Sequence, residues 1–142
     1  MRRLSKTFLT VAGIIAVVSI FVFIGYAIVC FSCKDLSDES IHALMSPYYS
    51  FVPGDSEAEK VAFARNFLKL TAYFMIAEGV LAVPTAVVCF TSKSKSSAGL
   101  YITAIILNVL VWCVFGILGG IFGLVANNQE DKQQKQNVID AQ

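Results

Sequence analysis

The stretch from Leu70 to Phe90, LTAYFMIAEGVLAVPTAVVCF, decides the fold that we expect for this chain. A helix that crosses a bilayer needs about 20 predominantly apolar residues, and this stretch supplies them with a single charged residue, Glu78. An acidic residue at the centre of such a helix costs about 2.5 to 3.5 kcal/mol, so it usually faces protein or water. The stretch therefore predicts a transmembrane helix with one charged residue, Glu78, near its middle.

Two further stretches, 7–32 and 96–129, contain no charged residue. The whole chain is 56% hydrophobic and only 15% charged, against about 25% charged residues in soluble domains. We therefore expect an all-α membrane protein, a single domain of residues 1–142 with three transmembrane helices over 8–31, 68–90 and 99–126. A fourth span is not expected, because 96–129 is too short for two helices of about 20 residues and a turn.

The positions of lysine and arginine near the helix ends predict the orientation. The leader carries Arg2, Arg3 and Lys6, and the short connection after the second span carries Lys93 and Lys95, in both cases without an acidic residue. We expect both segments in the cytoplasm. The long loop 32–67, which is acidic overall, and the polar tail 127–142 are then expected outside, in a multi-pass protein of the cell membrane.

The long outer loop carries signals of local order. Ser37 can cap a short helix that ends at Pro47, and Ser56 with Glu59 forms a capping box. The second helix is therefore expected to begin near Glu57, well before its apolar part, and to extend beyond the membrane.

Thr71, Glu78 and Thr85 are seven residues apart and so lie along one stripe of the second helix. Asn108 on the third helix is the expected partner of Glu78, at a similar depth. One interpretation is a hydrogen bond that holds two helices together. The other makes Glu78 a proton or cation site, or the contact for a larger membrane subunit.

Four glycines, Gly116, Gly119, Gly120 and Gly123, form two overlapping GxxxG pairs that let helix backbones approach closely. They can pack within the bundle or between copies of the chain. Few small residues are expected opposite them at the same depth, which slightly favours a contact between copies.

The turn SKSKSSAG at 92–99 and the ending GILGGIFGLVA at 116–126 make the last third of the chain similar to small glycine-rich bacterial multi-pass membrane proteins of unknown function. The resemblance implies a membrane location and a helical architecture. It transfers no active site.

No nucleophile with a nearby base, phosphate loop or histidine cluster is visible in the sequence, and no basic face suits nucleic acid. We therefore expect no enzymatic activity, no cofactor, no metal site and no nucleic-acid partner. The expected partners are the lipid bilayer and either further copies of the chain or a larger membrane protein. The main hypothesis is a non-enzymatic accessory or scaffold subunit; the alternative is a small proton- or cation-coupled transport or channel component that uses Glu78.

Overall fold

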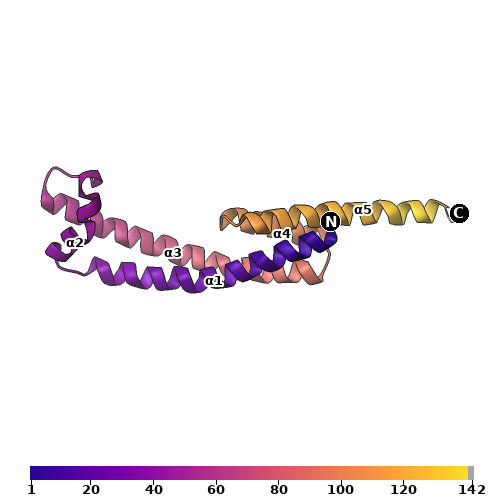
Figure 1. The fold of residues 1–142 in the computed structure, drawn as a ribbon, viewed down its shortest axis with the longest axis horizontal. Helices are drawn as coiled ribbons and strands as arrows, with labels where there is room; N and C mark the ends of the chain where they lie inside the picture. The colour runs from indigo at the N-terminus through magenta and orange to yellow at the C-terminus, as the bar shows by residue number, and fades with distance from the viewer. Residues whose placement is uncertain (141–142) are drawn as a thin grey trace. The chain divides into compact units, whose positions relative to one another are not determined.

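The computed structural model describes residues 1–140, in which helices are the only regular elements (Figure 1). Two of them, α1 (Arg2–Lys34) and α3 (Glu57–Ser94), are long and apolar enough to cross a membrane, and they contain the first two predicted spans. The remaining elements are α2 (Asp38–Met45), the 3₁₀ helix η1 (Ser46–Phe51), α4 (Ala98–Leu110) and α5 (Val114–Asp140).

The chain divides into two compact units. Unit 1 combines Met1–Ile20 with Val80–Gln142, and unit 2 is the continuous segment Phe21–Gly79. Unit 1 therefore contains the beginning of α1, the end of α3, and α4 and α5. Unit 2 contains the end of α1, the beginning of α3, and the elements between them.

The prediction of a single third helix over 99–126 is wrong, because the chain reverses its direction in the middle of this stretch. Within unit 1, α4 ends at Leu110 and α5 begins at Val114, and the two helices lie side by side as a hairpin (Figure 1). Trp112 at the turn has φ +55°, the left-handed conformation that commonly ends a helix. With 13 residues, α4 is about 20 Å long, which is shorter than a hydrocarbon core of about 30 Å.

The hairpin also reverses the direction of the polar tail. The Arg2 guanidinium lies 2.7 Å from the Glu130 carboxylate and donates a hydrogen bond of 2.8 Å to the Ser96 hydroxyl. The leader, the connection between α3 and α4, and the start of the tail therefore meet at one end of unit 1. The start of the tail therefore lies beside the N-terminus and not at the opposite end of unit 1 as expected, and the tail continues α5 as a helix to Asp140.

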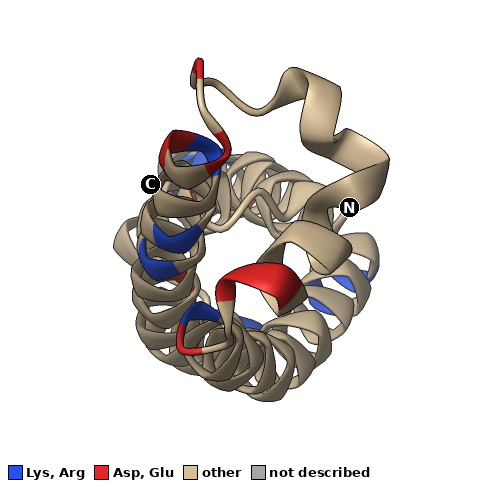
Figure 2. Ribbon diagram, turned by 90° about the vertical axis from the view of Figure 1, so that its left-hand side faces the viewer, with Lys and Arg blue, Asp and Glu red and all other residues tan. Residues whose placement is uncertain are grey.

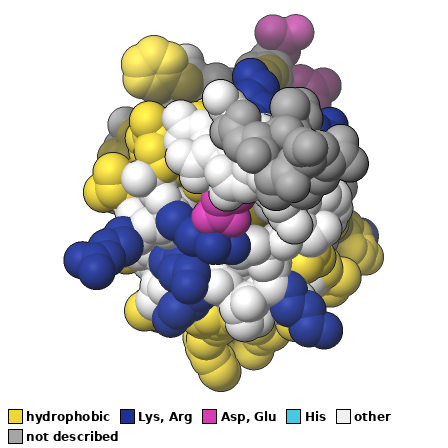
Figure 3. All heavy atoms as spheres, turned by 90° about the vertical axis from the view of Figure 1, so that its right-hand side faces the viewer, with side chains coloured by type: hydrophobic (Ala, Val, Ile, Leu, Met, Phe, Trp, Pro, Cys, Tyr) yellow, Lys and Arg dark blue, Asp and Glu magenta, His cyan; other side chains and the backbone are white. Residues whose placement is uncertain are grey.

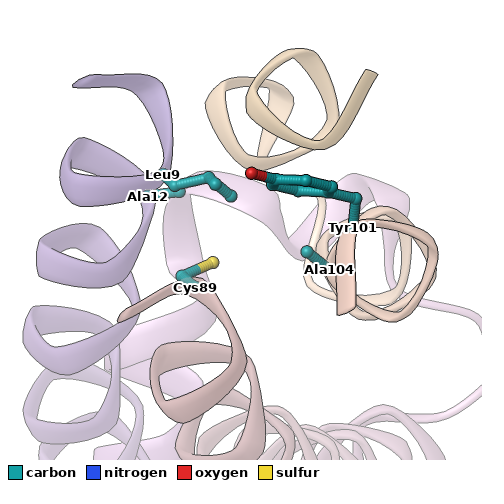
Figure 4. Close-up of a cluster of buried hydrophobic side chains, with 5 residues drawn as sticks. All are labelled: Leu9, Ala12, Cys89, Tyr101 and Ala104. Carbon is teal, nitrogen blue, oxygen red and sulfur yellow. The ribbon is translucent and has the colours of Figure 1, made fainter. Parts of the chain in front are cut away.

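The core of unit 1 is a buried cluster from three helices. Figure 4 shows its side chains turned toward one another: Leu9 and Ala12 of α1, Cys89 of α3, and Tyr101 and Ala104 of α4. Small residues in this set let the helices approach closely, so a single aromatic ring fills much of the space between them.

In unit 2, the predicted local signals of the loop are confirmed. The Ser40 amide donates to the Ser37 hydroxyl at 3.3 Å, and α2 begins directly after this cap. The capping box of Ser56 and Glu59 is formed in both directions, each bond 3.3 Å, and α3 begins at Glu57. The short helix α2 ends at Met45, two residues before the expected Pro47, and the residues after it form the 3₁₀ helix η1.

Arg65 of α3 holds the loop of unit 2 in place. Its guanidinium donates to the backbone carbonyl of Lys34, which ends α1, to that of Leu36 at 2.7 Å, and to the Asp38 carboxylate at 2.6 Å. A small apolar cluster beneath consists of Ile41, Val61 and Ala64. Figure 2, which looks onto the left-hand side of Figure 1, shows acidic and basic residues interspersed on this loop and on the neighbouring turns.

Candidate functional site: two polar positions in apolar helices

Glu78 lies on α3 in unit 2, between apolar neighbours. It is partly exposed, and within unit 2, which is described throughout, its carboxylate forms no hydrogen bond or ion pair. The adjacent Gly79 is buried. A Cβ placed on it would be in ordinary van der Waals contact with the side chains of Phe23 and Ile24 of α1. One side of this turn of α3 therefore packs on α1, and the neighbouring Glu78 is partly exposed.

An apolar hollow lies along α3 before Glu78. It has a volume of about 470 Å³ and is lined by Leu70, Thr71, Tyr73 and Phe74. Thr71, Phe74 and Glu78 are spaced by three and four residues, so they lie on the same face of the helix. The predicted stripe therefore continues in unit 2 as an open, mainly apolar surface with a carboxylate at one end.

Thr85, the third member of the predicted stripe, belongs to unit 1 and is fully buried. Its hydroxyl donates to the backbone carbonyl of Leu81 at 2.7 Å, one turn back along α3. Pro84 lies inside this helix and cannot donate to Val80. Thr85 thus satisfies its own hydroxyl locally.

Asn108 is the second polar position, on α4 in unit 1, and its side chain is completely buried. Its amide donates to the backbone carbonyl of Ala104 at 2.7 Å and to the sulfur of Cys89 at 3.3 Å. Its side-chain oxygen has no hydrogen-bond partner among the described residues and lies against Gly116 of α5. Asn108 therefore links α4 with α3 and packs on α5, all inside unit 1.

The expected pair of Glu78 and Asn108 involves residues of different units and stays a prediction. Each residue has an environment of its own. Both donor hydrogens of the Asn108 amide are used at Ala104 and Cys89, whereas Glu78 has no bonded group in unit 2. The contacts of unit 1 thus use both donors of Asn108 but leave its side-chain oxygen without a partner in the part of the chain that is described, and the Glu78 carboxylate has no bonded partner in unit 2.

All four glycines of the GxxxG pairs pack within the chain, so the slight preference for a contact between copies is wrong. A Cβ at Gly116 would overlap the Asn108 side chain, and one at Gly123 would overlap the Tyr101 ring. A Cβ at Gly119 would lie 3.0 Å from the Leu9 backbone nitrogen. The hairpin explains this outcome, because it brings α5 back alongside both α4 and the beginning of α1.

The contacts of three further residues were not predicted from the sequence. Ser5 is fully buried and donates to the backbone carbonyl of Gly119 at 2.7 Å. Cys89 accepts the Asn108 amide, and Tyr101 covers Gly123. These single residues on α1, α3 and α4 give only a weak signal in the sequence, because the contacts of Ser5 and Tyr101 form only when α5 is folded back onto α1 and α4.

The remaining reactive groups do not converge. The four cysteines are free, and α1 continues past Cys30 and Cys33, which places both thiols inside a helix. A polar pocket of about 360 Å³ in unit 2 is lined by Asp38, Glu39, His42, Glu57, Ala58 and Val61. Across the described residues, however, no three His, Cys, Asp or Glu side chains are placed to hold a metal ion.

Comparison with family models, with curated proteins and with solved structures finds no match for this chain. The resemblance of its last third to glycine-rich bacterial membrane proteins therefore stays a prediction. The function has to be argued from the two units themselves.

Proposed function

We propose that this protein is a non-enzymatic, multi-pass membrane accessory or scaffold subunit that binds a partner helix inside the bilayer. The partner is a second copy of the chain or a larger membrane protein. The observation that carries the proposal is Glu78, a carboxyl group without a bonded partner in its own unit, on the same face of α3 as the hollow at Thr71 and Phe74. A helix with a hydrogen-bond donor at the matching depth would fill the hollow and satisfy the carboxyl group.

The proposed topology has two crossings, by α1 and α3, with the hairpin of α4 and α5 entering the bilayer and returning. Two crossings bring the chain back to the side where it began. This agrees with the ion pair of Arg2 and Glu130 within unit 1. The basic leader and the pair Lys93 and Lys95 favour the cytoplasm for this side, which leaves the loop of unit 2 outside.

A photo-crosslinking residue tests the partner surface in native membranes. We would place p-benzoylphenylalanine at Phe74, which is 56% exposed, and as a control at Val22 of α1, which is 58% exposed. A specific adduct is expected from position 74. Its mass separates a second 15.4 kDa copy from a larger protein. Equal labelling from positions 74 and 22 would refute the proposed surface.

Two substitutions of Glu78 test its part in the contact. Glu78→Gln keeps a hydrogen-bonding group and should preserve the adduct, whereas Glu78→Leu should weaken it several-fold, since interhelical hydrogen bonds in membranes contribute about 0.6 to 2 kcal/mol. An adduct that is unchanged in Glu78→Leu would remove Glu78 from the contact.

A second candidate function is proton- or cation-coupled transport, favoured by the same partly exposed carboxyl group. It makes a different prediction for Glu78→Gln, since an amide cannot exchange a proton. In sealed vesicles that contain the protein, this variant should abolish proton or cation flux while the Phe74 adduct remains. Equal flux in vesicles with and without the wild-type protein would refute transport.

A further inference from the structure

The strongest feature outside the Glu78 surface is the end of unit 1 where the leader, the α3–α4 connection and the tail meet. Its basic residues come from three separate segments of the chain. They are Arg2, Arg3 and Lys6 from the leader, Lys93 and Lys95 from the end of α3 and its connection, and Lys132 and Lys135 from the tail. We call this set the basic end.

The contacts of Arg2 bring these three segments together at the same end of unit 1. Arg2 reaches both Ser96 in the connection and Glu130 in the tail. Lys93 and Lys95 lie within three residues of Ser96 in the chain, and Lys132 and Lys135 follow Glu130 within two turns of α5. The folding back of α5 therefore adds two lysines to the basic leader, a convergence that a tail on the opposite side would not produce.

The basic end has an unbalanced charge. The three segments contain seven basic residues and three acidic ones by sequence, Glu130, Asp131 and Asp140, and Glu130 is already paired with Arg2. The other six basic side chains are exposed and form no ion pair within the described part of the chain. Figure 3 shows dark blue side chains spread around an acidic one on this face.

The basic end also lies at the boundary between apolar and polar sequence. Lys6 lies two residues before the apolar stretch of α1 that begins at Phe8, and Lys93 lies three residues after that of α3, which ends at Phe90. Along α5, Lys132 is six residues beyond Ala126, a rise of about 9 Å. The polar headgroup layer on each side of a bilayer is about 5 to 8 Å thick, and charges act across about 8 Å at physiological salt.

We propose that the basic end binds the phosphate headgroups of anionic lipids in the membrane that surrounds the protein. This inference rests on the membrane location in the proposed function, but it does not involve Glu78 or its partner. Exposed ammonium and guanidinium groups at headgroup level match lipid phosphates in charge and in hydrogen bonding. The Arg2–Glu130 pair fixes the tail beside the other cations, so the headgroup contacts come from a folded surface and not from a loose extension.

The experiment uses the full chain in vesicles of phosphatidylcholine with a minor share of phosphatidylglycerol. Flotation first shows whether the protein is embedded. The protein is then extracted with its surrounding lipid in polymer discs, and the ratio of the two lipids in the discs is measured by mass spectrometry. Phosphatidylglycerol is expected to be enriched over the bulk, and about 1 M salt should reduce the enrichment by shortening the screening distance to about 3 Å.

Two matched variants locate the effect. Lys93→Gln with Lys132→Gln should weaken phosphatidylglycerol binding roughly 25-fold and so bring the lipid ratio in the discs close to that of the bulk, because each basic residue near an anionic surface contributes about a fivefold change in binding. Lys60→Gln with Lys69→Gln removes the same charge from unit 2 and should leave the enrichment unchanged.

The outcomes separate this inference from the proposed function. A protein that does not float with the vesicles would overturn the membrane location and with it this inference. A protein that floats without enrichment, or two variants with equal effects, would overturn the lipid site alone. Displacement of phosphatidylglycerol by free inorganic phosphate, or by an acidic protein that copurifies with the chain, would also overturn it.

Discussion

The two units are built from parts of the same two long helices but are held together by different means. Unit 1 depends on close backbone approach, with Gly116 and Gly123 against Asn108 and Tyr101. Unit 2 depends on a partly exposed guanidinium, that of Arg65, which binds the end of α1, the connection after it and the first residue of α2. Close packing therefore stabilises unit 1, whereas polar contacts order the loop of unit 2. The two units should respond to different kinds of substitution.

The largest effect is expected from adding a single methyl group to unit 1. Gly116→Ala places a Cβ on top of the Asn108 side chain, which is held by bonds to Ala104 and Cys89 and cannot move freely. Overpacking of this kind costs on the order of 2 to 3 kcal/mol. Thermal unfolding of the purified protein in detergent, followed by circular dichroism, should show a clearly lower midpoint.

Two further variants sharpen this prediction. Gly25→Ala in unit 2 meets nothing within 4 Å and should leave stability within about 1 kcal/mol of the wild type. Because the three atoms nearest to a Cβ at Gly116 all belong to Asn108, Asn108→Ala should recover much of the loss in Gly116→Ala. Purely additive effects of the two substitutions would show that Asn108 and Gly116 do not pack as described.

A smaller and more local effect is expected from the polar contacts of unit 2. Arg65→Gln removes the charge-assisted bonds to Asp38 and to two backbone carbonyls. With the Arg65 side chain one-third exposed, the loss should be about 1 to 2 kcal/mol, which is about a five- to thirtyfold faster opening of the loop. Hydrogen exchange should accelerate over 35–50 while α4 and α5 stay unchanged.

Lys69→Gln is the matched control for Arg65→Gln. Lys69 is exposed on the same helix and forms none of these bonds, so its variant should exchange like the wild type. Faster exchange of equal size in both variants would mean that net charge, and not the bonds of Arg65, orders the loop.

The sequence was sufficient where local chemistry determines structure. The caps at Ser37 and Ser56 depend on side chains within three residues of the amides that they bind, and both helix starts were predicted from them. The apolar runs of α1 and α3 likewise showed helices long enough to cross a membrane.

The hairpin could not be predicted in the same way, because its turn lacks the usual signals. Helices commonly end at a glycine or asparagine in the left-handed conformation, and here Trp112 takes that position within an unbroken apolar run. Once this turn was missed, the partners of the four glycines and the direction of the tail were missed as well. An isolated charge in an apolar stretch is visible in the sequence without any tertiary information, so Glu78 could be singled out as a candidate site. The group that binds it has to be identified by experiment.

The smallest effect is expected from Tyr49 in unit 2, whose hydroxyl is enclosed and has no hydrogen-bond partner there. Burial raises the pKa of this hydroxyl above its ordinary value of 10.0, and the nearby Glu57 carboxylate raises it further. The folded chain then holds this proton more firmly than the unfolded chain, so the contribution to stability is complete below pH 10.0 and is lost as pH rises through the folded pKa. The phenolate absorbance of the wild type minus that of Tyr49→Phe should give a titration curve with its midpoint above 10.0. Glu57→Gln should lower this midpoint only in part, since burial is the larger cause, and a midpoint at 10.0 in the wild type would contradict the enclosure of Tyr49 in unit 2.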